Sequence, residues 1–243
     1  MKEKIAISLS KDTLNKIDKT IDKTTIRSRS QAIETLIKKG MASQEVDAAV
    51  ILLSREHTAL PSRPFKGSTI LDHQIAMFRK NDISRIYIIA QGDLRTEKAV
   101  VIRTNEEKNG DALRQIREFV KGNFVVMSGD VYANFDLQGL VEKHASSGKL
   151  ATIGLRSSPF PVKYGTAVLA GDLVTEFQEK PKKAESHIIN AGIYVFSPQI
   201  FKLMKGSIER NVLPELARKG ELVGYFTSGE YTHFGENYSE ANK

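Results

Sequence analysis

A carboxylate that follows an apolar strand is the first feature of the sequence that could do chemistry. Residues 124–128 read Phe-Val-Val-Met-Ser, an apolar run of strand length, and Gly129-Asp130 follow directly. Ligands of open α/β sheets bind outside the carboxyl ends of the strands, so we expect Asp130 at the ligand edge. Mg²⁺ prefers oxygen ligands of this kind and also binds phosphates. A Gly-Asp pair is common in turns as well, so taken alone it favours a turn over a metal site.

Five other segments of the sequence help to interpret this carboxylate. They are Asn109-Gly110-Asp111-Ala112-Leu113, Tyr164-Gly165-Thr166-Ala167, Phe177-Gln178-Glu179-Lys180-Pro181, Asn190-Ala191-Gly192-Ile193-Tyr194-Val195-Phe196 and Tyr231-Thr232-His233-Phe234-Gly235-Glu236-Asn237-Tyr238. In this order, and with the strand that ends at Asp130, they resemble the sugar-phosphate nucleotidyltransferase (nucleotide-sugar pyrophosphorylase) family from residue 47 to the C-terminus. The resemblance implies an α/β fold with a Rossmann-like, mostly parallel sheet of the nucleotidyltransferase (GT-A-like) type.

The resemblance also implies which residues bind a ligand. In the family, these segments lie beside the nucleobase, the sugar and the sugar phosphate. The ligand-binding positions that follow are Gly110 beside the base, Gly165 and Asn190 beside the sugar, and Glu179 and Lys180 on the sugar phosphate. Asp130 and His233 stand at the two positions where the family holds its metal ion. The alternative is that these residues are present only because turns favour Gly and Asn.

The chain departs from the family where catalysis takes place. After its first strand the family has a glycine-rich loop ending Gly-Thr-Arg-Leu, whose amides cradle the triphosphate and whose arginine neutralises it. Here residues 54–60 read Ser-Arg-Glu-His-Thr-Ala-Leu, so β-carbons block the glycine positions and Ala59 replaces the arginine. In the family a Pro-Lys pair follows this loop. Here either Arg63-Pro64 or Pro64-Phe65-Lys66 corresponds to it.

A second departure weakens the metal site. His233 stands where the family has an aspartate, and an imidazole is a poor ligand for a hard cation. Nucleotidyl transfer depends on positioning and charge neutralisation, so these losses together predict a very slow reaction. The sequence therefore predicts no catalytic residues and possible Mg²⁺ at a weakened site of Asp130 and His233. The pocket would bind a nucleotide or sugar phosphate without turning it over.

The composition excludes several classes of site. The chain has no cysteine, which excludes disulfides and thiol catalysis and suits the cytoplasm. No apolar run approaches the length of a membrane span, so we expect no membrane partner. His57, His73, His144 and His187 show no metal-ligand spacing and are expected at the surface.

Strand and helix patterns alternate after residue 47. Strands are expected at 48–53, 85–90, 100–103, 124–128, 150–155, 166–170, 191–196 and 222–227, and helices at 69–81, 111–121, 137–144, 198–204 and 208–219. This alternation favours a mostly parallel α/β sheet covered by helices.

The first 41 residues follow another pattern. Residues 4–10 alternate, with apolar side chains at positions 5, 7 and 9, which predicts a half-buried strand. Ser10 is a good N-cap for a helix with apolar residues at 14, 17 and 21. A second helix opens with the capping-box spacing Ser28-x-x-Gln31 and is expected to end at Gly40.

About forty residues of this kind bury too little surface to fold alone, and a single strand needs a partner. The pattern resembles the ribbon-helix-helix (CopG/MetJ/Arc-like) family over residues 2–41, in which two copies form a β-ribbon that enters the DNA major groove. The resemblance implies DNA contacts by Lys4, Ala6, Ser8, Arg27, Ser28 and Arg29. Ten Lys or Arg against five acids place five of the chain's seven net positive charges here. The alternative is a basic dimerisation arm that touches no DNA.

The main hypothesis from the sequence is a cytoplasmic, DNA-binding transcription regulator. Residues 1–41 would be its ribbon-helix-helix domain, 42–46 a linker, and 47–243 an inactive nucleotidyltransferase-like domain, a pseudoenzyme that senses a ligand or drives oligomerisation. Its expected partners are double-stranded DNA, a second copy of the chain in a homodimer or tetramer, and a nucleotide or sugar phosphate. One alternative is an active sugar-1-phosphate nucleotidyltransferase with a DNA-binding or dimerisation arm. Another is an assembly protein in which the large domain is a spacer.

Overall fold

The computed structural model describes residues 6–44, 46–57, 59–227 and 229–234, and the chain divides into two compact units. The small unit comprises Met1–Ala42 and the large unit Ser43–Lys243. Two helices form the described part of the small unit, α1 (Lys11–Asp18) and α2 (Arg29–Gln44), the second of which extends two residues beyond it.

Side-chain caps start both helices of the small unit, as the sequence predicts. Ser10 Oγ accepts a hydrogen bond from the backbone N–H of Thr13 over 3.2 Å at the start of α1. Ser28 Oγ accepts one from the N–H of Gln31 over 3.2 Å at the start of α2. Each bond satisfies an amide that the first turn of a helix leaves unpaired.

The described part of the strand expected at residues 4–10 is not a strand. Residues 6–10 have no regular secondary structure, and Lys4 lies outside the described residues. A strand needs a hydrogen-bonding neighbour, and the described part of the small unit contains none. The ribbon-helix-helix arrangement is therefore not shown. The expected helix end at Gly40 is also wrong, because α2 continues to Gln44 through most of the expected linker and β1 begins at Val46.

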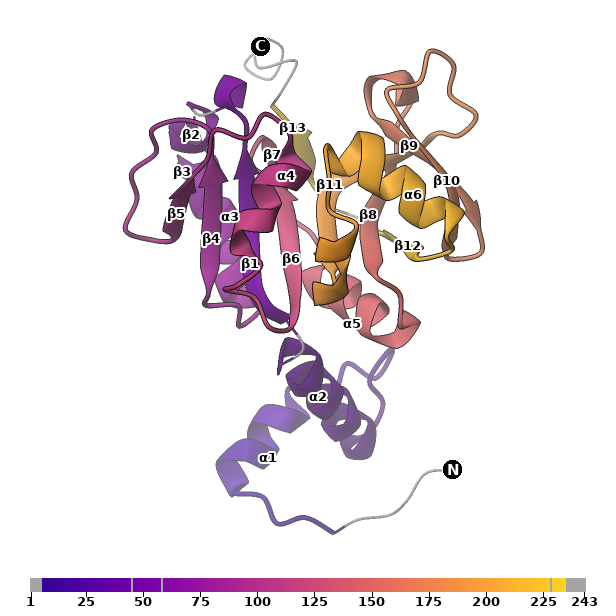
Figure 1. Ribbon diagram of the computed structural model, residues 1–243. Coiled ribbons are helices and arrows are strands. Elements are labelled where there is room, and N and C mark those ends of the chain that lie inside the picture. The colour runs from indigo at the N-terminus through magenta and orange to yellow at the C-terminus, as the bar shows by residue number, and fades with distance from the viewer. Residues whose placement is uncertain (1–5, 45, 58, 228, 235–243) are drawn as a thin grey trace. The chain divides into compact units, whose positions relative to one another are not determined.

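The large unit is built on a nine-stranded sheet with the strand order β5-β4-β1-β6-β11-β8-β12-β10-β9 (Figure 1). Its strands are β1 (Val46–Leu53), β4 (Ile86–Ala90), β5 (Val100–Arg103), β6 (Asn123–Ser128), β8 (Ala151–Ser157), β9 (Gly165–Ala170), β10 (Leu173–Glu179), β11 (Ile188–Phe196) and β12 (Leu222–Phe226). Strands β1 and β4 are apolar and almost entirely buried, as is typical of strands covered on both faces.

The sheet is mixed, which corrects the expectation of a mostly parallel one. Strands β5, β4, β1 and β6 are parallel to one another, whereas β11 runs antiparallel to β6 and to β8. Strand β6 is thus the boundary between the two halves. Strand β10, which the sequence did not predict, forms a hairpin with β9 and places Val174 and Phe177 in the core.

Helices cover both faces of the sheet, with α4 and α6 in front and α3 behind in Figure 1. The helices are α3 (Ile70–Lys80), α4 (Asn109–Leu113), α5 (Leu137–Ser147) and α6 (Leu213–Arg218), with short 3₁₀ or π turns at 55–57, 60–62, 114–116, 161–163, 198–202 and 208–212. Leu113 on α4 and Leu213 on α6 share one buried cluster with Val126 and Phe196 of the sheet. None of the described helices combines the length and apolar character that crossing a bilayer requires.

Two short ladders lie beside the sheet. Strand β7 (Val131–Ala133) pairs with β13 (Tyr231–His233), and β2 (Pro64–Phe65) pairs with β3 (Ser68–Thr69). The ring of Phe65 packs edge-on against the rings of Tyr132 and Phe234 and so joins the two ladders. Because β7 begins directly after Asp130 and β13 ends at His233, the first ladder brings these two residues together.

His144 on α5 is buried, contrary to the expectation of a surface residue. Its Nδ1 lies 3.0 Å from Thr152 Oγ1 and its Nε2 lies 3.0 Å from Ser197 Oγ. Burial lowers the pKa of this imidazole from 6.5 to about 4. Both hydrogen-bonding partners are uncharged hydroxyls, so neither adds a negative charge that would offset the cost of burying a protonated ring.

We expect the free energy of unfolding to fall as the pH is lowered from about 6.5 to about 4. The unfolded chain protonates this histidine first, so acid favours the unfolded state until the native ring also binds a proton. A shift of this size corresponds to about 3 kcal/mol. Urea titrations at each pH measure the loss. His144→Gln should remove it and His187→Gln, at an exposed position, should not; an unchanged profile for His144→Gln would contradict this account.

Candidate functional site

A cleft of about 380 Å³ opens at the carboxyl end of β6, where the sheet changes from parallel to antiparallel. It collects six of the seven ligand and metal positions expected from the sequence, namely Asp130, Gly165, Glu179, Lys180, Asn190 and His233. They come from the ends of four strands of the large sheet and from β13, so the fold assembles positions far apart in the sequence. The seventh, Gly110, does not line this cleft.

The turn that carries Asp130 is held tightly. The Asp130 side chain is only 7% exposed, and Ser128 Oγ donates a hydrogen bond to its Oδ1 over 2.6 Å. The N–H of Gly129 donates to the carbonyl of Leu52 over 2.8 Å. A β-carbon on Gly129 would lie 2.1 Å from Leu53 Cδ2, so this close approach of the turn to β1 requires glycine.

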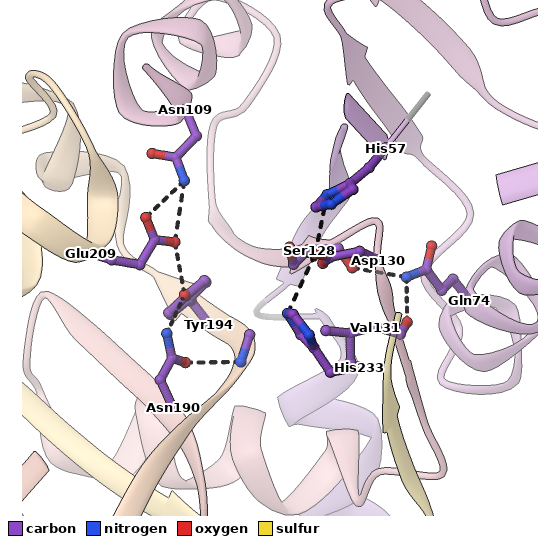
Figure 2. Close-up of polar contacts among 11 residues, drawn as sticks. His57, Gln74, Asn109, Ser128, Asp130, Val131, Asn190, Tyr194, Glu209 and His233 are labelled. Carbon is purple, nitrogen blue, oxygen red and sulfur yellow. Dashed lines mark hydrogen bonds and ion pairs between the residues drawn. The ribbon is translucent and has the colours of Figure 1, made fainter. Parts of the chain in front are cut away.

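Two imidazoles face the other oxygen of Asp130 (Figure 2). His57 Nδ1 lies 3.2 Å and His233 Nε2 lies 3.4 Å from Asp130 Oδ2. His57 comes from the short 3₁₀ turn Arg55–His57 after β1, where the sequence predicted a loop unable to cradle phosphates and a histidine at the surface. The surface assignment is wrong, because the loop turns this side chain into the cleft.

Asp130 is the described residue best suited to bind a cation here. Its carboxylate oxygens are compatible with Mg²⁺. His57 and His233, however, are directed at the carboxylate itself, and no three His, Asp or Glu side chains in the described part of the chain are arranged to hold a metal ion. The protein side chains described here therefore do not complete a magnesium site by themselves.

The wall formed by β9 and β10 carries the expected sugar-phosphate residues. Strand β10 ends at Glu179, and Lys180 follows with φ 45° and a backbone N–H that donates to Tyr164 O over 3.1 Å. That left-handed conformation is unusual for a lysine and is fixed by the bond to Tyr164. A β-carbon on Gly165 would lie 2.7 Å from Glu179 Oε2, so glycine at this position leaves room for the carboxylate.

A chain of buried and partly buried hydrogen bonds around Glu209 forms another part of the lining (Figure 2). Asn190 Nδ2 donates to Tyr194 Oη over 2.7 Å, and Tyr194 Oη donates to Glu209 Oε1 over 3.1 Å. Asn109 Nδ2 also donates to this carboxylate, over 2.9 Å to Oε2. Burial and the neighbouring Glu209 carboxylate raise the pKa of Tyr194 well above 10.0, so its hydroxyl remains a donor to Glu209.

The sequence interpretation missed Tyr194 and Glu209. A signal for Tyr194 was present, because residues two and four positions along a regular strand share a face and Tyr194 follows Asn190 by four. In β11 the pairing with β8 is irregular between these two residues, and their side chains nevertheless meet. Glu209 offered no such signal: it lies on the π turn Ile208–Val212 and reaches the cleft through tertiary packing alone.

A smaller hollow of about 100 Å³ adjoins the cleft at His57 and Ser128, which line both. Asn109 lines the smaller hollow, on the side where the resemblance implies the nucleobase. Gly110 has a different reason to be glycine, because a β-carbon there would lie 2.5 Å from the carbonyl oxygen of Gly206. It allows close packing of two backbone segments.

The residues expected to contact DNA form no shared surface that the structure shows. Ala6 and Ser8 are exposed in the segment without regular structure, and Lys4 lies outside the described residues. Three others serve the small unit itself: Arg29 donates twice to the Asp18 carboxylate, each over 2.7 Å, while Arg27 N–H and Ser28 Oγ take part in capping α2.

Comparison with known proteins identifies the large unit. A family model described as nucleotidyl transferase matches residues 53–222. A Sulfolobus acidocaldarius protein named, provisionally, as a mannose-1-phosphate guanyltransferase is 30% identical over 168 residues, which is 63% of this chain and 47% of that protein. The mannose-1-phosphate guanylyltransferase catalytic subunit beta of Danio rerio is 28% identical over 198 residues, 72% of this chain and 55% of that protein. The chain thus spans about half the length of these curated relatives.

Solved structures support the same fold. A UDP-glucose pyrophosphorylase complexed with UDP-glucose superposes with a TM-score of 0.66 at 14% identity, covering 78% of this chain and 94% of that one. No comparison points to a ribbon-helix-helix domain. The hypothesis of a DNA-binding transcription regulator with an inactive large domain is wrong, because the relatives that match are named as sugar-phosphate nucleotidyltransferases. The expectation that the chain is a pseudoenzyme fails for the same reason.

Replacing Tyr194 tests the buried wall. Tyr194→Phe removes the hydroxyl that pairs with both Asn190 and Glu209, and leaving these buried groups short of a partner should cost about 1–3 kcal/mol of folding stability. Tyr225→Phe is the matched control, because the Tyr225 hydroxyl donates to Asp136 over 2.6 Å at an exposed site. This variant should lose less stability than Tyr194→Phe, since water can replace the lost bond. Equal losses in urea denaturation of the two variants would show that the wall is not held by this hydroxyl.

Proposed function

Since the chain belongs to the nucleotidyl transferase family, we propose that its large unit transfers a nucleotidyl group from a nucleoside triphosphate to a sugar 1-phosphate. The observation that carries the proposal is the cleft at the end of β6. It gathers Glu179 and Lys180 from the end of β10, Asn190 from β11 and Asp130 from the end of β6. The same end of an α/β sheet is where ligands are held in general.

In this reaction an oxygen of the sugar 1-phosphate attacks the α-phosphorus of the triphosphate. The bond between that phosphorus and the oxygen bridging to the β-phosphate breaks, and pyrophosphate leaves. Two anions must approach each other, so positive charge near the sugar phosphate lowers the barrier. Lys180, in its fixed backbone conformation at the end of β10, is the residue we assign to this task.

The uncharged and acidic residues of the cleft suit a sugar. Hydroxyl groups of a hexose both donate and accept, and the walls offer Asn190, Glu179 and Glu209 as acceptors and donors. We place the nucleoside in the adjoining hollow beside Asn109. The names of the relatives make mannose 1-phosphate and GTP the first pair to test.

Asp130 is the residue that we propose as the protein ligand for Mg²⁺. When bound with the triphosphate, Mg²⁺ would supply further neutralisation of phosphate charge, and the Asp130 carboxylate is the oxygen ligand that the chain offers. His233, expected as a second ligand, lies with its Nε2 3.4 Å from Asp130 Oδ2.

Several expectations from the sequence stay predictions. They are the partition of the chain at residues 41 and 47, the cytoplasmic location, self-association, and a polyanionic partner for the basic first segment. The proposed reaction requires none of them, because the residues assigned to it all lie in the large unit.

Replacing Lys180 tests the proposal. Pyrophosphate release is measured with purified protein, GTP, mannose 1-phosphate and Mg²⁺, followed by the other nucleoside triphosphates and hexose 1-phosphates. Lys180→Met should lower kcat/KM by about 100-fold or more, as loss of a group that stabilises developing charge does.

Lys143→Met is the control, because Lys143 lies on α5 and pairs with Asp172 outside the cleft. It should retain wild-type activity. Pyrophosphate release that is absent for every substrate pair, or equal in Lys180→Met and wild type, would contradict the proposed function.

A further inference from the structure

A buried glutamine on α3 holds the turn that carries Asp130. The Gln74 side chain is almost inaccessible, with the residue 2% exposed. Its Nε2 donates to the carbonyl of Ser128 over 2.9 Å and to the carbonyl of Val131 over 2.7 Å (Figure 2). One amide group therefore uses both of its N–H bonds on the two carbonyls that bracket Gly129 and Asp130.

Other contacts fix the same turn from different directions. Gly129 N–H donates to Leu52 O at the end of β1, and Asp130 O accepts from Phe234 N–H beyond β13, each over 2.8 Å. Neither of these backbone bonds reaches the carbonyls of Ser128 and Val131. Gln74 supplies the contact from the helix, so the carboxylate is anchored from a strand, a short ladder and a helix together.

The side-chain oxygen of Gln74 shows that this residue does more than fill space in the core. Gln74 Oε1 is buried and has no hydrogen-bond partner within the described part of the chain. A buried polar atom without a partner opposes folding, and a methionine of similar size would fill the same space without that cost. The two hydrogen bonds that Gln74 donates are the contribution that a methionine could not make.

We propose that Gln74 is a positioning residue for the reaction, and that it acts by fixing Asp130 through the Ser128 and Val131 carbonyls. This inference rests on the proposed nucleotidyl transfer for its effect on rate. Without Gln74 the turn keeps its backbone bonds to Leu52 and Phe234 but can shift toward or away from α3. A displacement of about 1 Å in a group that orients reacting phosphates is enough to lower a rate by about 100-fold.

The test compares Gln74→Met with Thr152→Val. The first removes both donated bonds and keeps the volume. The second removes a buried hydroxyl on β8 that pairs with His144 of α5. Thr152 does not line the cleft, so this variant reports what a loss of stability alone does. If Gln74→Met does not fold, Gln74→Asn takes its place, because it keeps the amide but withdraws it from the carbonyls by one methylene.

Two quantities are measured for each variant. The first is amide hydrogen exchange of residues 128–131, which needs no activity; we expect it to be at least tenfold faster in Gln74→Met than in Thr152→Val. The second is the steady-state rate: kcat should fall about 10- to 100-fold in Gln74→Met while KM for the sugar 1-phosphate changes less than threefold.

Exchange and kcat that match those of Thr152→Val would overturn the proposal. If the wild-type protein transfers no nucleotidyl group, the proposed function fails, and the exchange measurement alone decides whether Gln74 fixes the turn. Faster exchange without a change in kcat would also overturn it, since the turn would then move without consequence for the reaction.

Discussion

The position of one carboxylate is the constraint on which the rest of the site depends. Asp130 lies just past the end of β6, the strand at which the sheet changes from parallel to antiparallel. The turn that carries Asp130 packs against β1 at Gly129 and leads into the β7–β13 ladder. The Asp130 carboxylate accepts a hydrogen bond from Ser128 and faces two imidazoles. These contacts hold the turn in place, so Asp130 is fixed relative to the other residues that line the cleft.

Much of this site was readable from the sequence. An apolar strand ending in Gly-Asp placed Asp130 at the ligand edge, and the ordered segments around Gly165, Lys180 and Asn190 were assigned to one pocket, which the structure assembles. Local patterns of this kind can be predicted, because residues close in sequence determine where a strand ends and which turn follows it. The caps at Ser10 and Ser28 were predictable for the same reason.

The parts that were not predicted depend on tertiary contacts. Glu209 enters the cleft from a π turn, and His57 turns inward from the loop that the sequence predicts to be unable to cradle phosphates. The change from parallel to antiparallel pairing depends on the contact between β11 and β6, which strand periodicity does not specify. The predicted inactive regulator is wrong, because the family match extends over residues 53–222 although the loop after β1 lacks the glycines. The strand predicted at residues 4–10 required a second copy of the chain as its partner, and residues 6–10 form no strand.

The most direct test of the central claim is phosphorus NMR of the purified chain with GTP, mannose 1-phosphate and Mg²⁺. The account predicts that the triphosphate signals are replaced by those of pyrophosphate and of a sugar diphosphate ester, and that Asp130→Asn abolishes this conversion without unfolding the protein. Unchanged triphosphate and sugar phosphate with the wild-type chain, or the same conversion by Asp130→Asn, would contradict it.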